Sequence, residues 1–218
     1  DPQPGGGRMV HHVERDDDRQ AEIEDLRGEV EVPLEVGRVD DALAGFGHEV
    51  TLLRGQGSAR PQQVSDGEKF SSCADLLAKL QHRLGTGAYD AVVMTAAVAD
   101  YRPDAAQLGK IRSDADELVV RLVRNPKILP QLKAMAPRPL RVIGFKFTVG
   151  ADFEARRAAV TAQWSAGGVD ATVHNDLHEI QSSATHPFYL WARPATTPVL
   201  LGGVPALAAA LHAVWSKD

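Results

Sequence analysis

The sequence has very little cysteine and lacks any long apolar run. Cys73 is the single cysteine, so an internal disulfide bond is impossible, which is typical of a reducing compartment. No apolar run approaches the roughly 20 residues that a membrane-spanning helix needs. A charged-then-apolar leader is also missing, and we therefore expect a cytoplasmic protein. With no CxxC motif and only scattered histidines, the sequence predicts no metal ion held by protein side chains.

Excess positive charge is missing as well. The formal net charge of -5 argues against a general nucleic-acid-binding protein. Residues 1–40 hold 12 Asp or Glu against 5 Arg and no Lys, a net charge of -7, whereas the rest of the chain is close to neutral. This break predicts an atypical acidic N-terminal segment, residues 1–40, followed by one folded domain, residues 41–218. At 218 residues the chain is long enough for a domain with a real core.

The sequence contains no GxGxxG motif after a first strand, which disfavours an ordinary dinucleotide-binding enzyme. Short apolar runs at 91–94, 141–147 and 169–173 are separated by helical segments, and this alternation is typical of parallel strands with right-handed crossovers. Two late strands, 188–191 and 199–201, predict a hairpin. We therefore expect an α/β fold: a Rossmann-like three-layer domain with a mainly parallel sheet and a late β-hairpin.

Charged residues cluster directly after the apolar run at 91–94. Thr95 and Ala96 are small enough for a ligand to approach the backbone, and Asp100, Arg102 and Lys110 follow. Because ligands of open α/β sheets bind beyond the carboxyl ends of strands, this pattern indicates a polyanion site. The alternative is that these are ordinary solvated loop charges. Further on, a helix is expected from Pro126 to about Ala136, with Asn125 as its cap.

Four motifs occur in an order that resembles one enzyme family. AAVADYRP followed by GKIR, then NPKIL at 125–129, GF at 144–145 and VHND at 173–176 are similar to the nucleotide-site signature of phosphopantothenoylcysteine synthetase. The resemblance covers about residues 41–218. It implies a phosphopantothenate–cysteine ligase of coenzyme A biosynthesis, which forms an acyl nucleotidylate from CTP or ATP with Mg²⁺ and then transfers the acyl group to cysteine. It also implies a homodimer with small-molecule substrates and no nucleic-acid or membrane partner.

The resemblance also assigns residues to roles. Lys110 is the expected catalytic cation, which stabilises charge at the phosphates. Phe145 is expected either to stack on the base or to be an ordinary core residue. His174 is expected to be a turn residue rather than a general base. The residues expected to bind the nucleotide are Thr95, Ala96, Asp100, Lys110, Pro126, Lys127, Ile128, Leu129 and Phe145.

The sequence departs from the family in three places. Lys127 replaces the usual acidic residue. No lysine between 148 and 216 matches the lysine pair of bacterial relatives, so that contact is either lost or supplied by an arginine, Arg156 or Arg157. Residues 1–40 lack the first strand, the Gly-Gly-Thr turn and the Asn/Ser-Gly loop, with Gly5–Gly7 as the only echo. That segment is therefore divergent, disordered or read out of frame. A non-catalytic dimeric relative, or another Rossmann-type nucleotide-binding enzyme, is the alternative, and we expect the chain as written to lack turnover.

Overall fold

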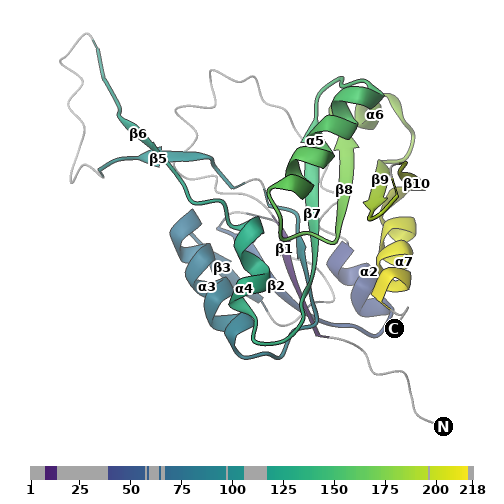
Figure 1. Ribbon diagram of the computed structural model, residues 1–218, viewed down its shortest axis with the longest axis horizontal. Helices are drawn as coiled ribbons and strands as arrows, with labels where there is room; N and C mark the ends of the chain where they lie inside the picture. The colour runs from purple at the N-terminus through teal and green to yellow at the C-terminus, as the bar shows by residue number, and fades with distance from the viewer. Residues whose placement is uncertain are drawn as a thin grey trace.

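A central eight-stranded sheet organises the computed structural model, which describes residues 39–56, 58, 64, 67–96, 98–105, 117–195 and 197–215, and the backbone of 8–13. The strand order is β10-β9-β8-β7-β4-β1-β2-β3 (Figure 1). The six strands from β3 to β8 in this order are parallel, and β9 and β10 form an antiparallel hairpin at one edge. The strand bounds are β1 Arg8–Val13, β2 Glu49–Gly55, β3 Gly67–Phe70, β4 Ala91–Met94, β7 Arg141–Thr148, β8 Ala171–Asp176, β9 Pro187–Ala192 and β10 Val199–Gly202. The predicted fold class and late hairpin are therefore confirmed.

The first strand of the sheet, β1, lies inside the acidic segment 1–40, where the sequence predicted no such strand. β1 pairs in parallel with β2 on one side and with β4 on the other, with Met9 opposite both Val50 and Ala91. The expectation that residues 1–40 lack a central strand is thus wrong. The run RMVHHV contains two histidines and only three apolar side chains, so its pattern did not stand out. Residues 14–38 of the acidic segment lie outside the described residues.

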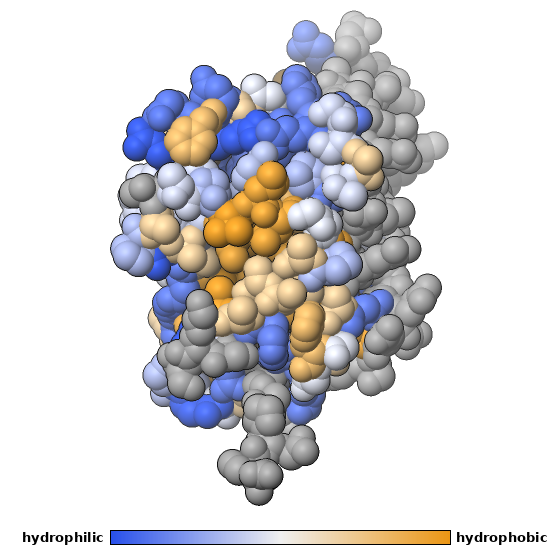
Figure 2. Space-filling model, turned by 90° about the vertical axis from the view of Figure 1, so that its right-hand side faces the viewer, coloured by the Kyte–Doolittle hydropathy of each residue, from blue (hydrophilic) through white to orange (hydrophobic). Residues whose placement is uncertain are grey.

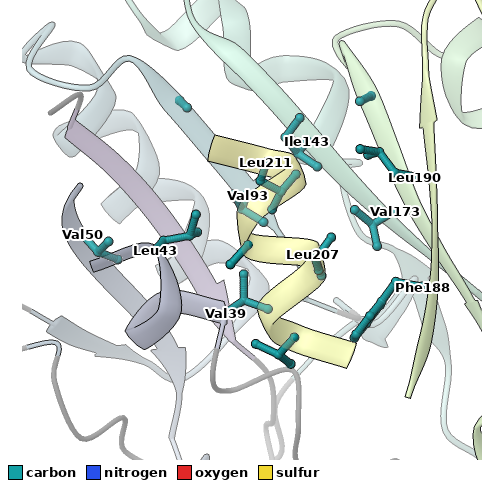
Figure 3. Close-up of a cluster of buried hydrophobic side chains, with 14 of the residues drawn as sticks. Val39, Leu43, Val50, Val93, Ile143, Val173, Phe188, Leu190, Leu207 and Leu211 are labelled. Carbon is teal, nitrogen blue, oxygen red and sulfur yellow. The ribbon is translucent and has the colours of Figure 1, made fainter. Parts of the chain in front are cut away.

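Helices cover both faces of the sheet and enclose two hydrophobic cores. On one face lie α2 (Val39–Gly45) and α7 (Gly203–Trp215), whose Leu43, Leu207 and Leu211 point onto the strands (Figure 3). On the other face the core includes α3 (Cys73–Gly85), the 3₁₀ turn η2 (Leu129–Gln131) and α4 (Leu132–Met135). α5 (Phe153–Ser165) and the short α6 (Leu177–Ser182) complete the helices described. None of the helices in the described ranges is long and apolar enough to span a bilayer.

Local sequence signals explain where these helices begin and end. The Ser72 side chain accepts a hydrogen bond from the backbone N–H of Asp75, as the predicted cap requires. Gly47 follows α2 with a φ of +85°, the left-handed conformation that glycine adopts most readily. The predicted helix from Pro126 to Ala136 is wrong in its first part. It begins only at Leu129, as a 3₁₀ turn, because Asn125 uses its polar groups to bind another loop.

A second, two-stranded sheet projects from the body of the molecule (Figure 1). It is formed by β5 (Tyr101–Pro103) and β6 (Leu122–Arg124), which pair in an antiparallel manner. The strand predicted over 117–124 is therefore shorter than expected. Apolar side chains on and beside this hairpin arm are exposed: Tyr101, Leu118, Val119, Val120 and Leu122. An isolated two-stranded sheet is marginally stable in water, so this arm needs a further surface to cover it.

Candidate functional site

The candidate site lies where the order of the parallel strands reverses. Going along the chain, β2 and β3 lie on one side of β1, whereas β4, β7 and β8 lie on the other. Crossover helices consequently leave the sheet on opposite faces at the junction of β1 and β4, and a crevice forms beyond their carboxyl ends. The chain leaves β4 at Met94 and enters the segment with Thr95, Ala96 and Asp100. The fold therefore brings the predicted polar cluster to the expected position for a ligand.

Thr95 has a hydroxyl group that lacks a partner in the described part of the chain. Its Oγ1 is buried and makes no hydrogen bond there, although buried polar groups are normally satisfied. Thr95 and the neighbouring Ala96 are both partly buried at the end of β4. A ligand oxygen or nitrogen that entered the crevice would supply the missing partner. This is the clearest sign of an unfilled polar site at the sheet edge.

Asp100 and Lys127 approach each other across this edge. The Lys127 ammonium forms an ion pair with the Asp100 carboxylate, although 65% and 59% of their side chains are exposed. The backbone N–H of Asn125 donates to the Asp100 carbonyl over 2.8 Å. An exposed pair of this kind contributes at most about 1 kcal/mol, so either group can exchange its partner for a ligand.

Asn125 holds the two predicted loops together, and its side chain is buried. Its Nδ2 donates to the carbonyl of Ala99 over 2.9 Å, and its Oδ1 accepts from Arg102 Nη1 over 3.0 Å. Arg102 also donates to the carbonyl of Arg124 over 3.1 Å. Asn125 is therefore a tether between the β4 exit and the start of η2, not a helix cap. The sequence did not reveal this role, because a short polar side chain before proline is typical of a helix cap. The same pattern also fits a side chain that bonds to a neighbouring loop.

The predicted residues on the Asn125–Leu129 turn have different surroundings. Pro126 and Lys127 are exposed at the site, whereas Ile128 is buried in the core with α3. Leu129 is partly buried and begins η2. The side chain of Ile128 is thus unavailable to a ligand, and only its backbone could contribute. Lys110, the predicted catalytic residue, lies outside the described residues.

Phe145 lies on β7, one position beyond the last β4–β7 pair, Met94 with Gly144. Its ring is partly buried and packs against the core that contains α2 and α7. Its carbonyl accepts a hydrogen bond from Gln163 Nε2 on α5 over 3.0 Å. A Cβ atom on Gly144 would lie 2.8 Å from Gln163 Oε1, so glycine is what allows α5 to approach. Phe145 is held near the site, and its role in stacking stays a prediction.

A second polar cluster lies at the carboxyl ends of β7 and β8. Burial alone would raise the pKa of Asp176, but hydrogen bonds from the Thr148 hydroxyl (2.6 Å) and from the N–H groups of Ala151, Gly150 and His178 lower it to about 2. Because the Thr148 proton points to Asp176, its oxygen accepts the proton of His174 Nε2, 2.9 Å away. These bonds fix the turn between β7 and α5.

His174 is fully buried in this cluster, and its Nε2 bonds to the Thr148 hydroxyl rather than to a carboxylate. Burial, followed by the charge of Arg156, lowers the pKa of His174 to about 4. His174 lies within strand β8, so the expectation of a turn residue is wrong. That it is not a general base stays a prediction. Arg156 itself is engaged with Glu179 over 2.6 Å and lies over the Tyr189 ring. Arg157 pairs with Glu154.

Comparisons with known proteins identify a family model and relatives to which this chain is similar. A family model described as DNA/pantothenate metabolism flavoprotein C-terminal domain matches residues 38–191. The coenzyme A biosynthesis bifunctional protein CoaBC of Thermococcus kodakarensis is 33% identical over 131 residues, which are 60% of this chain and 32% of that protein. The CoaBC of Vibrio parahaemolyticus is 28% identical over 107 residues, 48% of this chain and 26% of that protein. The matched part therefore spans a third or less of these relatives.

Solved structures share the fold at low sequence identity. The DNA/pantothenate metabolism flavoprotein from Streptococcus pneumoniae superposes with a TM-score of 0.76 and 18% identity, over 98% of this chain and all of that one. The C-terminal domain of a CoaBC protein gives 0.68 and 18% identity, over 97% and 95% of the two chains. A Cab2 mutant in complex with phosphopantothenate-cysteine gives 0.68 and 12% identity, over 95% and 87%. At these identities the likeness shows the fold alone.

Proposed function

Since the chain belongs to the family of the DNA/pantothenate metabolism flavoprotein C-terminal domain, we propose that it is a phosphopantothenate–cysteine ligase domain of coenzyme A biosynthesis. The CoaBC relatives and the Cab2 complex support this reaction, because their names state coenzyme A biosynthesis and phosphopantothenate-cysteine. The observation that carries the proposal is the buried Thr95 hydroxyl, which has no hydrogen-bond partner in the described part of the chain and follows β4 at the strand-order reversal. We propose that it acts in the cytoplasm.

The proposed chemistry has two steps. A carboxylate oxygen of 4'-phosphopantothenate attacks the α-phosphorus of CTP or ATP, and the bond to the bridging oxygen breaks so that pyrophosphate leaves. The amine nitrogen of cysteine then attacks the acyl carbon, loses a proton, and displaces the nucleoside monophosphate. Negative charge builds up on the phosphate oxygens in the first step, where fixed cations stabilise the transition state. Lys110 and Lys127 are the lysines that the motifs bring to this site.

Other residues hold the nucleotide in this proposal. Thr95 and Ala96 contact it closely at the β4 exit, Asp100 binds its sugar or base, and Pro126, Ile128 and Leu129 contribute backbone groups. Phe145 stacks on the base. Mg²⁺ accompanies the triphosphate, because within the described ranges no cluster of three or more His, Cys, Asp or Glu is available to hold a metal ion. Mg²⁺ in such sites is commonly held by phosphates and water.

The hairpin arm supports a homodimer. Val119 is 87% exposed and Leu118 is 61% exposed, which is unusual for apolar side chains beside a two-stranded sheet. A second copy that covered the arm would bury these side chains and would lie next to the Asp100–Lys127 pair at its base. We therefore expect each site to be completed near the contact between two protomers.

The experiment is pyrophosphate release with phosphopantothenate, measured separately with CTP and ATP, before and after addition of cysteine. Release that depends on phosphopantothenate, followed by cysteine-dependent product, supports the ligase. In a form of the chain that releases pyrophosphate, Lys110→Ala should reduce release by at least about a hundredfold, because it removes one charge-stabilising group. Arg121→Ala, which removes an exposed cation directly before β6 (82% exposed), is the control and should retain the rate of that form. Near wild-type release by Lys110→Ala would remove Lys110 from the reaction.

A second candidate function is nucleotide binding without ligation. It is favoured by the segment after β1, because residues 14–38 contain no Asn, Ser or Thr to hold a phosphate or an acyl group. A chain that binds CTP or ATP at equilibrium but releases no pyrophosphate in any substrate mixture would decide for this alternative.

A further inference from the structure

The C-terminal part of the chain is almost without charge. From residue 180 to residue 216, Arg193 is the only Asp, Glu, Lys or Arg, whereas such residues make up 24% of the whole sequence. This segment forms β9, β10 and α7, which lie together at one end of the molecule. Figure 2 shows an apolar area in the middle of the face on this side of the molecule. Solvent-facing surfaces of folded proteins usually carry charges, so an uncharged face of this extent indicates contact with another surface.

β10 is the end strand of the sheet and is not protected. It pairs with β9 on one side, and no other strand of the described sheet lies on its other side. Val199 and Leu200 are 59% and 62% exposed. An edge strand of this kind presents free backbone N–H and C=O groups together with apolar side chains, and it readily pairs with a further strand.

The opposite edge of the same sheet provides a contrast. β3 carries Glu68 and Lys69 in the middle of its four residues, and Glu68 accepts a hydrogen bond from Arg83 Nε over 2.9 Å. Charged side chains on an edge strand oppose pairing, because the partner strand would bury them. The sheet thus has a protected edge at β3, which carries charged side chains, and an open edge at β10, which carries none.

The chemistry of the open edge limits its occupant. A partner strand must be uncharged and apolar to lie against Val199 and Leu200. Among the strands described in this chain, β3, β5 and β6 contain charged residues, whereas β10 itself contains none. Antiparallel pairing of β10 with its own copy about a two-fold axis places no like charges opposite each other.

α7 offers a compatible flank to such a copy. It contacts both β9 and β10, and its exposed positions are small, namely Pro205, Ala209 and Ala213. Neither steric bulk nor charge on this helix would keep a second sheet away. We propose that two copies of this chain associate through β10, which joins their sheets into one continuous sheet about a two-fold axis. This contact is separate from the hairpin arm and does not depend on the proposed ligase activity.

A cross-linking experiment tests the symmetry directly. The proposed register pairs Val199 with Leu201 of the partner subunit, so the two-fold axis passes through residue 200. In the full chain with Cys73→Ser, Leu200→Cys would then lie opposite its own copy. Mild oxidation should give a covalent dimer in high yield. Lys69→Cys on β3, in the same background, is the matched control and should stay uncross-linked. Equal yields from the two variants, or none from Leu200→Cys, would overturn the proposal.

A mass measurement tests the same contact without a new cysteine. Leu200→Lys should halve the mass in solution by light scattering, while its circular dichroism spectrum and melting temperature stay close to those of wild type, since the side chain is exposed. Leu118→Lys on the hairpin arm tests the other contact, and the double variant should be a monomer. If Leu200→Lys has the wild-type mass, or if the wild type is itself monomeric at micromolar concentration, the β10 contact does not exist.

Discussion

At the scale of single residues, the site combines groups that are firmly held with groups that are free to exchange. Asn125 is fixed by bonds to Ala99 and Arg102, and Asp176 is fixed by a hydroxyl and three backbone N–H groups. Asp100 and Lys127, by contrast, are exposed and paired with each other. A ligand therefore meets a rigid backbone that carries mobile charges. This division separates substitutions that should change binding from those that should change stability.

In a form of the chain with ligase turnover, Phe145→Ala should raise the KM for the nucleotide several-fold and leave kcat nearly unchanged. A ring that stacks on the base contributes equally in the ground state and the transition state, so its loss weakens binding without slowing chemistry. Phe147 lies two residues later on the same face of β7 and is 39% exposed, which makes Phe147→Ala a matched control. Both variants should be checked by thermal melting. A Phe145→Ala protein that melts early but has a wild-type KM would show that the ring is only part of the core.

His174 should make the stability of the protein depend on pH between about 6.5 and 4. The native state disfavours the imidazolium, as the lowered pKa of about 4 indicates, whereas the unfolded chain takes up the proton near 6.5. The unfolded state therefore binds more protons as the pH falls, and up to about 3 kcal/mol of unfolding free energy is lost across this window. Urea titrations at several pH values should show the slope in wild type and in His82→Gln, which changes an exposed histidine, but a much smaller slope in His174→Gln. An unchanged slope in His174→Gln would assign the effect elsewhere.

At the scale of elements, the connection between α5 and β8 depends on a glycine that contacts η2. Gly168 has a φ of +83°, and a Cβ atom there would lie 2.8 Å from the backbone Cα of Pro130. Since neither backbone can move without shifting η2, this contact sets the distance between the β8 entrance and the turn that carries Lys127. Gly47 has a similar φ of +85° but nothing within 4 Å of the added atom.

These two glycines give a matched pair of substitutions. Gly47→Ala should cost about 1–2 kcal/mol of unfolding free energy, which is the usual penalty for a left-handed residue with a Cβ atom. Gly168→Ala carries the same penalty and a clash with backbone, so its cost should be clearly larger. Urea unfolding of both variants measures the difference. Equal costs would mean that η2 moves freely away from β8.

The sequence predicted the elements whose side chains alternate or repeat clearly. The runs at 91–94, 188–191 and 199–201 were expected to be strands and are, since each pattern depends on neighbouring residues alone. β1 was missed because pairing with β2 and β4 on both sides stabilises a strand that has a weak pattern of its own. The Asn125 tether was missed for the same reason, because its partners Ala99 and Arg102 precede it by more than 20 residues. Local signals do not report long-range partners.

At the scale of the whole molecule, the described sheet contains the candidate site, but residues 14–38 contain no Asn, Ser or Thr, which the family resemblance leads us to expect after β1. We expect the unmodified chain to show no ligase turnover. Replacing residues 14–38 with a family-like loop that contains Asn and Ser-Gly should restore pyrophosphate release, because loss of one stabilising donor costs about 2.7–4 kcal/mol in the transition state. A loop of the same length made of Gly and Ala is the control. Robust turnover by the unmodified chain would show that its own segment is a working substitute.

The central position of β1 in the sheet affects how the protein unfolds. β1 is the strand that joins β2 and β3 to the other five strands of the sheet, and it is also the first of them to be synthesised. If β1 detaches, the hydrogen-bonded ladder separates into a two-strand part and a five-strand part, connected across the gap by packing such as that of α2 on α7. Native-state hydrogen exchange should then show the amides of β2 and β4 that face β1 opening together, at one common free energy. The least conspicuous strand of the sequence would thus set the cooperativity of unfolding.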